Sequence, residues 1–151
     1  MSTVAVASPA DLGAAATPGL RVIATTELGT RAALLEAKRL ATQFDLQQIV
    51  VLVPQVASSL ATLESPDDDA VTVERFRRMA RGTGVDATVN LCVCGALREM
   101  FRWMLPHGCL VILGGHRRWW WPTREQRIAD LLKQTGHRIV FADASRADLS
   151  D

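Results

Sequence analysis

The sequence predicts an α/β fold, a three-layer sandwich in which helices cover both faces of a five-stranded parallel sheet. Two observations support this prediction. Apolar, β-branched runs alternate along the chain with segments of helical periodicity. Strands that alternate with helices of this length run parallel and are joined by right-handed crossovers. The length of 151 residues is about that of one domain.

The N-terminal part predicts an arm, two strands and a helix between them. Residues 1–19 are small and alanine-rich, so we expect a flexible N-terminal arm. The first strand is expected in the apolar run 20–26, and a helical stripe follows over 33–44. The continuous apolar run 48–53 is typical of a central strand, and Pro54 is expected to end it.

The middle of the chain predicts a strand of a different kind between two helices. Residues 57–70 indicate a loop, and the next helix is expected over 71–81. Apolar and polar residues then alternate strictly over 85–93, which indicates a strand with one less buried face, as at a sheet edge. A further helical stripe ends before Pro106.

The C-terminal part predicts two strands and the last helix. Residues 109–113 are fully apolar and indicate a central strand. Thr123 and Gln126 have the spacing of a capping box, which predicts the start of a helix. The last strand is expected over 137–142, and residues 143–151 form a polar tail.

The strand order follows from the expected burial of each strand. The order 3-2-1-4-5 places the apolar fourth strand inside the sheet and the alternating third strand at an edge, whereas 2-1-3-4-5 does not. The domain itself is expected over 20–142. In such sheets, ligands bind beyond the carboxyl ends of the strands where the winding direction reverses. This switch point places residues 25–27 opposite 114–116.

A candidate phosphate site follows the fourth strand at this point. Gly114 and Gly115 allow the backbone to approach phosphate oxygens closely, and its exposed amides can form an anion nest. Arg117 and Arg118 offer bidentate hydrogen-bond donors. The alternative is a tight turn followed by solvated arginines, because no complete P-loop or GxGxxG motif follows. The three tryptophans at 119–121 cannot all face one pocket, so we expect at least one at the surface or in an interface.

Other patterns restrict the chemistry, the partners and the location. The zinc-type spacing of cysteine and histidine is absent and no catalytic motif is present, so we expect no metal site and no enzyme. A net charge of +1 favours neither nucleic acid nor membrane as a partner. The first basic residue is Arg21 and no apolar run approaches the ~20 residues that span a bilayer. Three cysteines, an odd number, indicate a reducing compartment, so we expect the cytoplasm.

The order of elements resembles that of the universal stress protein family over about 20–142. The most telling segments are 31–41 (RAALLEAKRLA), 49–53 (IVVLV) and 111–116 (VILGGH). The last of these is similar to the family's strand and its Gly-Ser/Thr-His-Gly-Arg turn. The resemblance implies an adenine-nucleotide-hydrolase-like α/β domain with strand order 3-2-1-4-5, a role in stress response and a homodimer.

The resemblance also implies ATP or another adenine nucleotide as ligand, but the family motif is broken in this sequence. ATP-binding members carry G-x2-G-x9-G-(S/T) after the fourth strand, whereas counting from Gly114 places Arg117 and Arg127 where the later glycines should be. Residues 25–27 (Thr-Thr-Glu) replace the usual aspartate after the first strand. The nucleotide-site positions that can be carried over are Thr26, Gly114, Gly115 and Thr123.

Two functions from different classes remain open at this stage. The first is a regulatory dimer that acts through an unidentified protein partner and binds ATP weakly or not at all. The second is a protein that binds a nucleotide or another phosphate through 114–118. The broken motif favours the first. The dimer is expected to form by antiparallel pairing of the strand over 137–142, an apolar edge without a central charge or proline.

Overall fold

The computed structural model describes residues 19–46, 48–56, 66–105, 110–116 and 123–144. Several sequence-based expectations fall outside these ranges. They are the arm before Gly19, the arginines Arg117 and Arg118, the tryptophans at 119–121, and the tail after Ala144.

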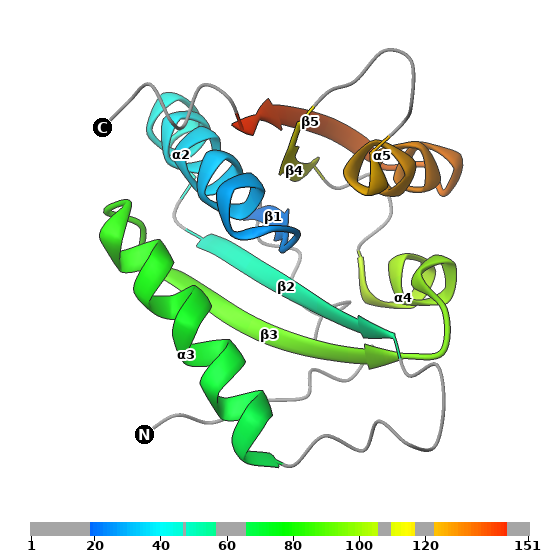
Figure 1. Cartoon of the computed structure of the whole chain (residues 1–151). Helices are drawn as coiled ribbons and strands as arrows, with labels where there is room; N and C mark the ends of the chain where they lie inside the picture. Colours follow the sequence, from blue (N-terminus) through cyan, green and yellow to red (C-terminus); the bar gives the residue numbers. More distant parts are fainter. Residues whose placement is uncertain (1–18, 47, 57–65, 106–109, 117–122, 145–151) are drawn as a thin grey trace.

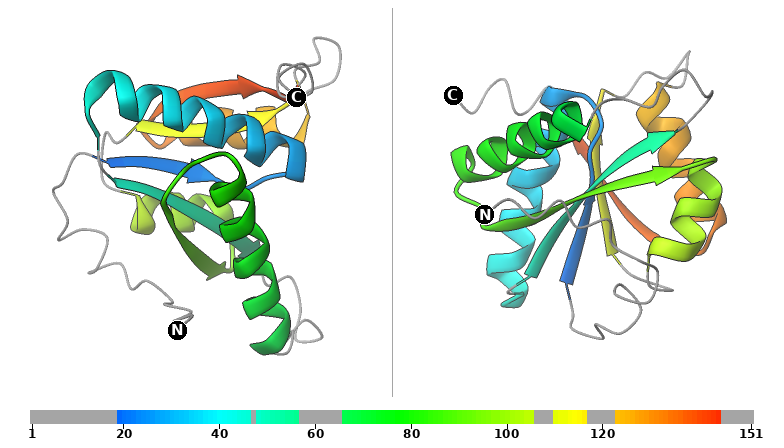
Figure 2. Two further views of the ribbon diagram at one scale, coloured as in Figure 1. Left: turned by 90° about the vertical axis from the view of Figure 1, so that its left-hand side faces the viewer. Right: turned by 90° about the horizontal axis from the view of Figure 1, so that it is seen from below.

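The strands form one fully parallel sheet in the order β3-β2-β1-β4-β5, which confirms the predicted fold class and strand order (Figure 1). The sheet is twisted, so its strands fan out when the molecule is turned (Figure 2). The alternating segment lies at one edge, as expected, and the last strand lies at the other. The strands are β1 (Gly19–Ile23), β2 (Gln48–Val56), β3 (Ala87–Cys94), β4 (Leu110–Gly115) and β5 (Arg138–Asp143).

Two helices cover each face of the sheet. On one face, α2 (Glu27–Phe44) and α3 (Pro66–Gly82) bury an aliphatic and aromatic cluster against β1, β2 and β3. On the other face, α4 (Leu97–Met104) and α5 (Arg124–Gln134) bury a second cluster that includes Phe101 and Leu113. Within the described ranges, no helix is both long and apolar enough to cross a bilayer.

Two element boundaries differ from the sequence-based expectation. Strand β2 continues through Pro54 to Val56 instead of ending at the proline. Beyond Leu52 it pairs only with β3, because the pairing with β1 ends there. A proline without an N–H is tolerated where one side of the strand has no neighbour. Helix α3 begins at Pro66, in the segment expected to be a loop, because proline is favoured in the first helical turn.

The outer ends of the first and last strands also differ slightly from those expected. Gly19 already belongs to β1 and Asp143 still belongs to β5, and the next residue, Ala144, is fully buried. The edge strand therefore runs over Arg138–Asp143 rather than 137–142. His137 precedes it as a buried side chain, with its Nε2 atom 3.3 Å from the Phe101 carbonyl oxygen.

Candidate functional site

The switch point is formed where β1 turns into α2, beside the end of β4. Thr26 caps α2, with its hydroxyl accepting a hydrogen bond from the Gly29 N–H at 3.0 Å. The Thr25 N–H donates to the Thr30 hydroxyl at 2.9 Å. The Thr25 hydroxyl donates to the Gly114 carbonyl at 2.7 Å and so joins the ends of β1 and β4. The last of these contacts places Thr25 beside Gly114, as expected.

The end of β4 is closed against α2 by contact between two glycines. A Cβ atom at Gly114 would overlap the Gly29 carbonyl oxygen and lie 2.6 Å from the Gly29 carbonyl carbon. A Cβ atom at Gly29 would in turn overlap the Gly114 carbonyl oxygen. Both residues are buried. The first turn of α2 therefore occupies the space beside Gly114, and glycine is required there because the two backbones touch.

The next glycine is closed against α5 in the same way. A Cβ atom at Gly115 would lie 2.5 Å from Cγ and 2.6 Å from Cβ of Glu125. Thr123 begins α5 with a complete capping box, in which Gln126 is the reciprocal partner, as the sequence predicts. The Thr123 hydroxyl also donates to the His116 carbonyl at 3.0 Å, so both ends of the connection between β4 and α5 are held together.

A pocket of about 370 Å³ opens on the other side of β1, beyond the carboxyl ends of β1 and β2. We call it the switch-point pocket. Helices α3 and α5 form its side walls, and its lining is more polar than apolar. The described lining consists of Ala24, Thr25, Thr26, Val53, Pro54, Gln55, Thr72, Arg75, Phe76, Arg124, Glu125 and Ile128.

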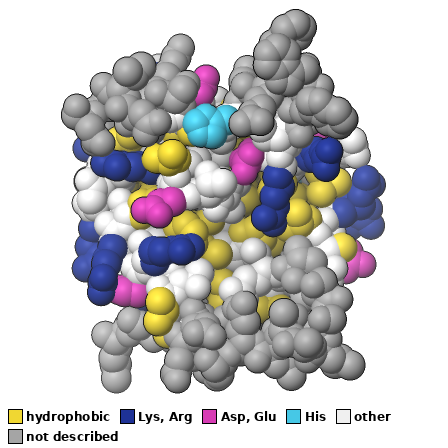
Figure 3. Space-filling view, in the orientation of Figure 1, with side chains coloured by type: hydrophobic (Ala, Val, Ile, Leu, Met, Phe, Trp, Pro, Cys, Tyr) yellow, Lys and Arg dark blue, Asp and Glu magenta, His cyan; other side chains and the backbone are white. Residues whose placement is uncertain are grey.

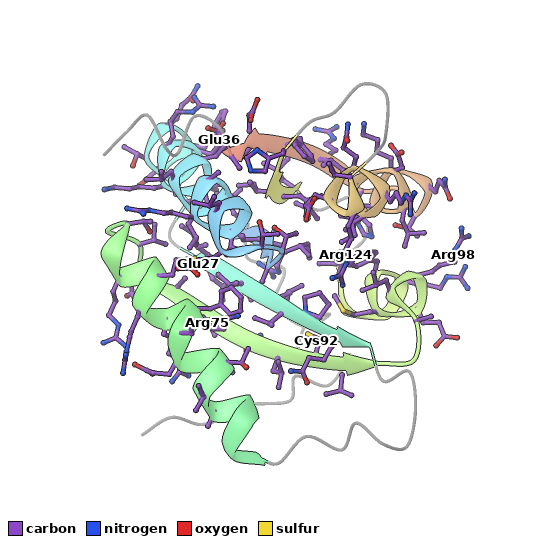
Figure 4. The ribbon with its side chains drawn as sticks, viewed as in Figure 1. Glu27, Glu36, Arg75, Cys92, Arg98 and Arg124 are labelled. Carbon is purple, nitrogen blue, oxygen red and sulfur yellow. The ribbon has the colours of Figure 1, made fainter. Side chains whose placement is uncertain are left out.

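The polar groups of the switch-point pocket include two guanidinium groups and one carboxylate. Arg75 on α3 and Arg124 at the start of α5 stand on opposite sides of β2 (Figure 4). The Arg75 guanidinium lies 5.0 Å from the centroid of the Phe76 ring, within the range of a cation–π contact. Glu125 is only 9% exposed. Figure 3 shows basic side chains on both sides of a hollow with an apolar floor.

The predicted site residues are only partly brought together. Thr26 lines the switch-point pocket, whereas Gly114 and Gly115 are buried beside it against the two helices. Thr123 caps α5 and is not among the described lining residues. Arg117 and Arg118 lie outside the described residues.

Sequence reasoning missed the two arginines of the switch-point pocket. Arg75 and Arg124 lie on the polar sides of helices, where an arginine alone normally indicates a solvated surface. The only available signal was positional. Arg124 directly follows the predicted cap Thr123, and a helix that starts after the fourth strand begins at the switch point.

Metal ligands are not clustered in the described part of the chain. Among the described residues, no three His, Cys, Asp or Glu side chains are close enough to hold a metal ion together. Cys92 on β3 is a buried thiol within the cluster beneath α4 and α5.

Comparison with known proteins identifies the fold. No protein-family model and no curated protein sequence matches this chain. Among solved structures, a universal stress protein from Archaeoglobus fulgidus matches with a TM-score of 0.56 and 12% identity, covering 82% of this chain and 92% of that one. A universal stress protein in complex with cAMP matches with a TM-score of 0.51 and 13% identity, covering 82% and 96%. The chain therefore has the fold of the universal stress proteins.

Proposed function

We propose that this protein is a regulatory protein that binds a nucleotide with a single phosphate group, AMP or a cyclic nucleotide, in the switch-point pocket. The observation that supports this function is the pair Arg75 and Arg124, which come from two helices to a pocket beside the switch point of the sheet. Ligands of open α/β sheets bind beyond the carboxyl ends of the strands near the switch point, and this pocket lies next to it, on the β2 side of β1. One solved structure with the same fold is a complex with cAMP.

Each part of such a nucleotide has a chemical counterpart in the switch-point pocket. The guanidinium groups of Arg75 and Arg124 suit the phosphate, because arginine makes charge-assisted and bidentate hydrogen bonds to phosphate oxygens. The Glu125 carboxylate is an acceptor for a ribose hydroxyl. Val53, Ile128 and other apolar lining residues suit the faces of a base.

The broken glycine pattern favours a monophosphate over ATP, and the switch-point pocket is large enough for a small ligand. The pocket volume of about 370 Å³ is near the lower end of the range of about 300–1,000 Å³ that is typical of ligand pockets. The glycine pattern that serves the triphosphate in ATP-binding family members is broken at Arg117 and Arg127. We therefore expect weak or absent ATP binding.

The proposal is one of binding rather than of turnover. The described polar lining consists of threonine, glutamine and arginine side chains with one carboxylate, a set suited to holding an anion.

A reducing cytoplasm is the location that suits the buried Cys92 thiol.

Titration calorimetry with AMP, cAMP and ATP tests the proposed ligand. We expect AMP or cAMP to bind more tightly than ATP. Arg75→Ala and Arg124→Ala should each weaken binding by roughly 10- to 150-fold, because a hydrogen bond to a charged group contributes about 1.5–3 kcal/mol. Arg98→Ala is the matched control, since Arg98 is exposed on α4 and bonds to Gln134 instead of lining the pocket (Figure 4).

Two results of this titration would contradict the proposal. One is that no monophosphate binds. The other is that the Arg75 and Arg124 variants bind AMP as tightly as the Arg98 variant does. A micromolar dissociation constant for ATP would contradict the expected weak ATP binding. It would favour Arg117 and Arg118 as the phosphate-binding residues instead.

The second part of the proposal is a homodimer through β5 that acts by protein contacts. The position of β5 at the sheet edge supports it, because one side of this strand has no neighbour among the described strands. Ile139, Val140 and Phe141 are half-buried there. Antiparallel pairing of two copies of β5 about a two-fold axis would satisfy the backbone groups of the edge.

Light scattering of the purified chain tests the dimer. We expect twice the chain mass of 16.5 kDa at micromolar concentration. Val140→Lys should give a monomer, because lysine on an edge strand opposes pairing between edges. Val140 also packs against the core, so the variant must keep the circular dichroism spectrum of the parent chain. Val93→Lys is the control, since Val93 is exposed on β3 at the opposite edge. Dissociation by Val93→Lys alone would move the interface to β3, and a monomeric parent chain would reject the dimer.

A further inference from the structure

A second hollow, of about 530 Å³, lies between α2 and α3 on the outer surface of one face of the sheet. We call it the α2–α3 groove. It does not belong to the switch-point pocket, although Arg75 contributes to both linings. The described lining consists of Glu27, Leu28, Arg31, Val71, Arg75, Arg78, Met79 and Gly82.

Apolar side chains are exposed in this groove. Leu28 on α2 is 40% exposed and Val71 on α3 is 68% exposed. They are two of the four large hydrophobic side chains that are exposed in the described part of the chain. Met79 is half-buried between them and the core. Apolar side chains that gather at one hollow, instead of being scattered singly, are typical of an interaction site.

Among the described lining residues of the groove, positive charges outnumber negative ones. Arg31, Arg75 and Arg78 line the groove together with one acidic residue, Glu27. Arg78 also lies 3.7 Å from the Glu74 carboxylate, but both side chains face solvent. An exposed ion pair at that distance contributes little. The groove therefore combines an aliphatic floor with an excess of guanidinium groups.

We propose that the α2–α3 groove is a docking site for an acidic amphipathic segment of a protein partner. Apolar side chains of the segment would cover Leu28, Val71 and Met79, and its carboxylates would pair with the arginines at the sides. The described lining has aliphatic side chains and no aromatic ring, which favours a peptide over single-stranded nucleic acid, whose bases stack on aromatic rings.

Fluorescence anisotropy with model peptides tests this docking site on the full chain. The probe is a fluorescein-labelled peptide that combines glutamate with leucine at helical spacing. One control peptide has lysine in place of every glutamate, and a second has serine in place of every leucine. We expect the acidic leucine peptide to bind at least about 10-fold more tightly than either control, because both charge and apolar contact are required.

Matched variants locate the binding. Arg31→Glu with Arg78→Glu should weaken peptide binding by at least about 10-fold. Arg98→Glu with Arg127→Glu makes the same change of charge at exposed positions of α4 and α5, and should leave binding nearly unchanged. Arg75 is kept intact in this test because it also lines the switch-point pocket. The outcome is then independent of the nucleotide that the pocket binds.

An uncharged variant guards against a general loss of the fold. Val71→Ser removes an exposed apolar contact and should weaken peptide binding while the circular dichroism spectrum and melting temperature stay close to those of the parent. The proposal is overturned if the acidic peptide does not bind, or if the two double variants lose binding equally. It is also overturned if labelled oligouridylate binds more tightly than the peptide and loses this binding in the Arg31→Glu, Arg78→Glu variant.

Discussion

The two sides of the β1 carboxyl end are built differently. Toward β4, the backbone of Gly114 touches Gly29 in α2, and Gly115 touches Glu125 in α5, so the protein itself fills the space. Toward β2, the pairing of β1 ends at Ile23, and β2 continues beyond it along β3. The switch-point pocket lies on this second side.

The difference shows that glycine can allow two kinds of close approach, to a ligand or to a neighbouring helix. The glycines after the fourth strand were predicted to bring a backbone close to phosphate, and in the structure they bring helices close to the sheet. Guanidinium groups lie near them, but side chains on α3 and α5 supply these groups. Glycine in this segment therefore indicates a close approach, and only the structure reveals what approaches.

The closed side predicts the largest effect on stability. Gly114→Ala should lower the free energy of unfolding by more than about 3 kcal/mol, because the new methyl group overlaps the first turn of α2 and overpacking of this kind strains the backbone. Urea denaturation measures the change. Gly82→Ala is the control, since nothing lies within 4 Å of its Cβ position at the end of α3, and it should change stability by less than about 1 kcal/mol. Equal losses in the two variants would refute the close contact of Gly114 with Gly29.

A smaller effect is expected at Gly115, because its neighbour is a side chain. Gly115→Ala should cost about 1–3 kcal/mol through contact with Glu125. In a Glu125→Gly background both the Cγ and the Cβ atoms are absent, so the same substitution should cost less, with a coupling of about 0.5–3 kcal/mol between the two sites. A double-mutant cycle from urea unfolding measures this coupling. Additive losses would show that the contact of Gly115 with Glu125 does not limit packing.

The parts of the fold that depend on local pattern could be predicted from the sequence. The alternation of apolar runs with helical stripes gives the fold class, and the polar residues of the third strand place it at an edge. The capping box of Thr123 and Gln126 is formed in full, because both partners lie within one helical turn. The continuation of β2 through Pro54 was missed, because it depends on where a neighbouring strand ends.

The sequence placed the candidate site between the first and fourth strands, whereas the switch-point pocket lies on the β2 side of β1. The switch point follows from strand order alone, whereas the contact of Gly29 with Gly114 joins residues far apart in the chain. Arg75 and Arg124 meet at one pocket only because α3 and α5 lie on opposite faces of the sheet and both begin near its carboxyl edge. The spacing of residues along the sequence does not predict that Arg75 and Arg124 line the same pocket.

The two threonine caps, Thr26 and Thr123, give the smallest expected effects that distinguish the two sides of the β1 carboxyl end. Thr26→Ala and Thr123→Ala each remove a side-chain cap, and each should cost about 0.5–2 kcal/mol in urea unfolding. Only Thr26 is among the described lining residues of the switch-point pocket, so Thr26→Ala should also weaken AMP binding, by roughly 2- to 10-fold for one neutral hydrogen bond. Thr26→Ser keeps the hydroxyl group and should restore both properties. If calorimetry shows the same loss of AMP affinity for Thr123→Ala, the ligand contacts the β4 side as well, and that side is not closed.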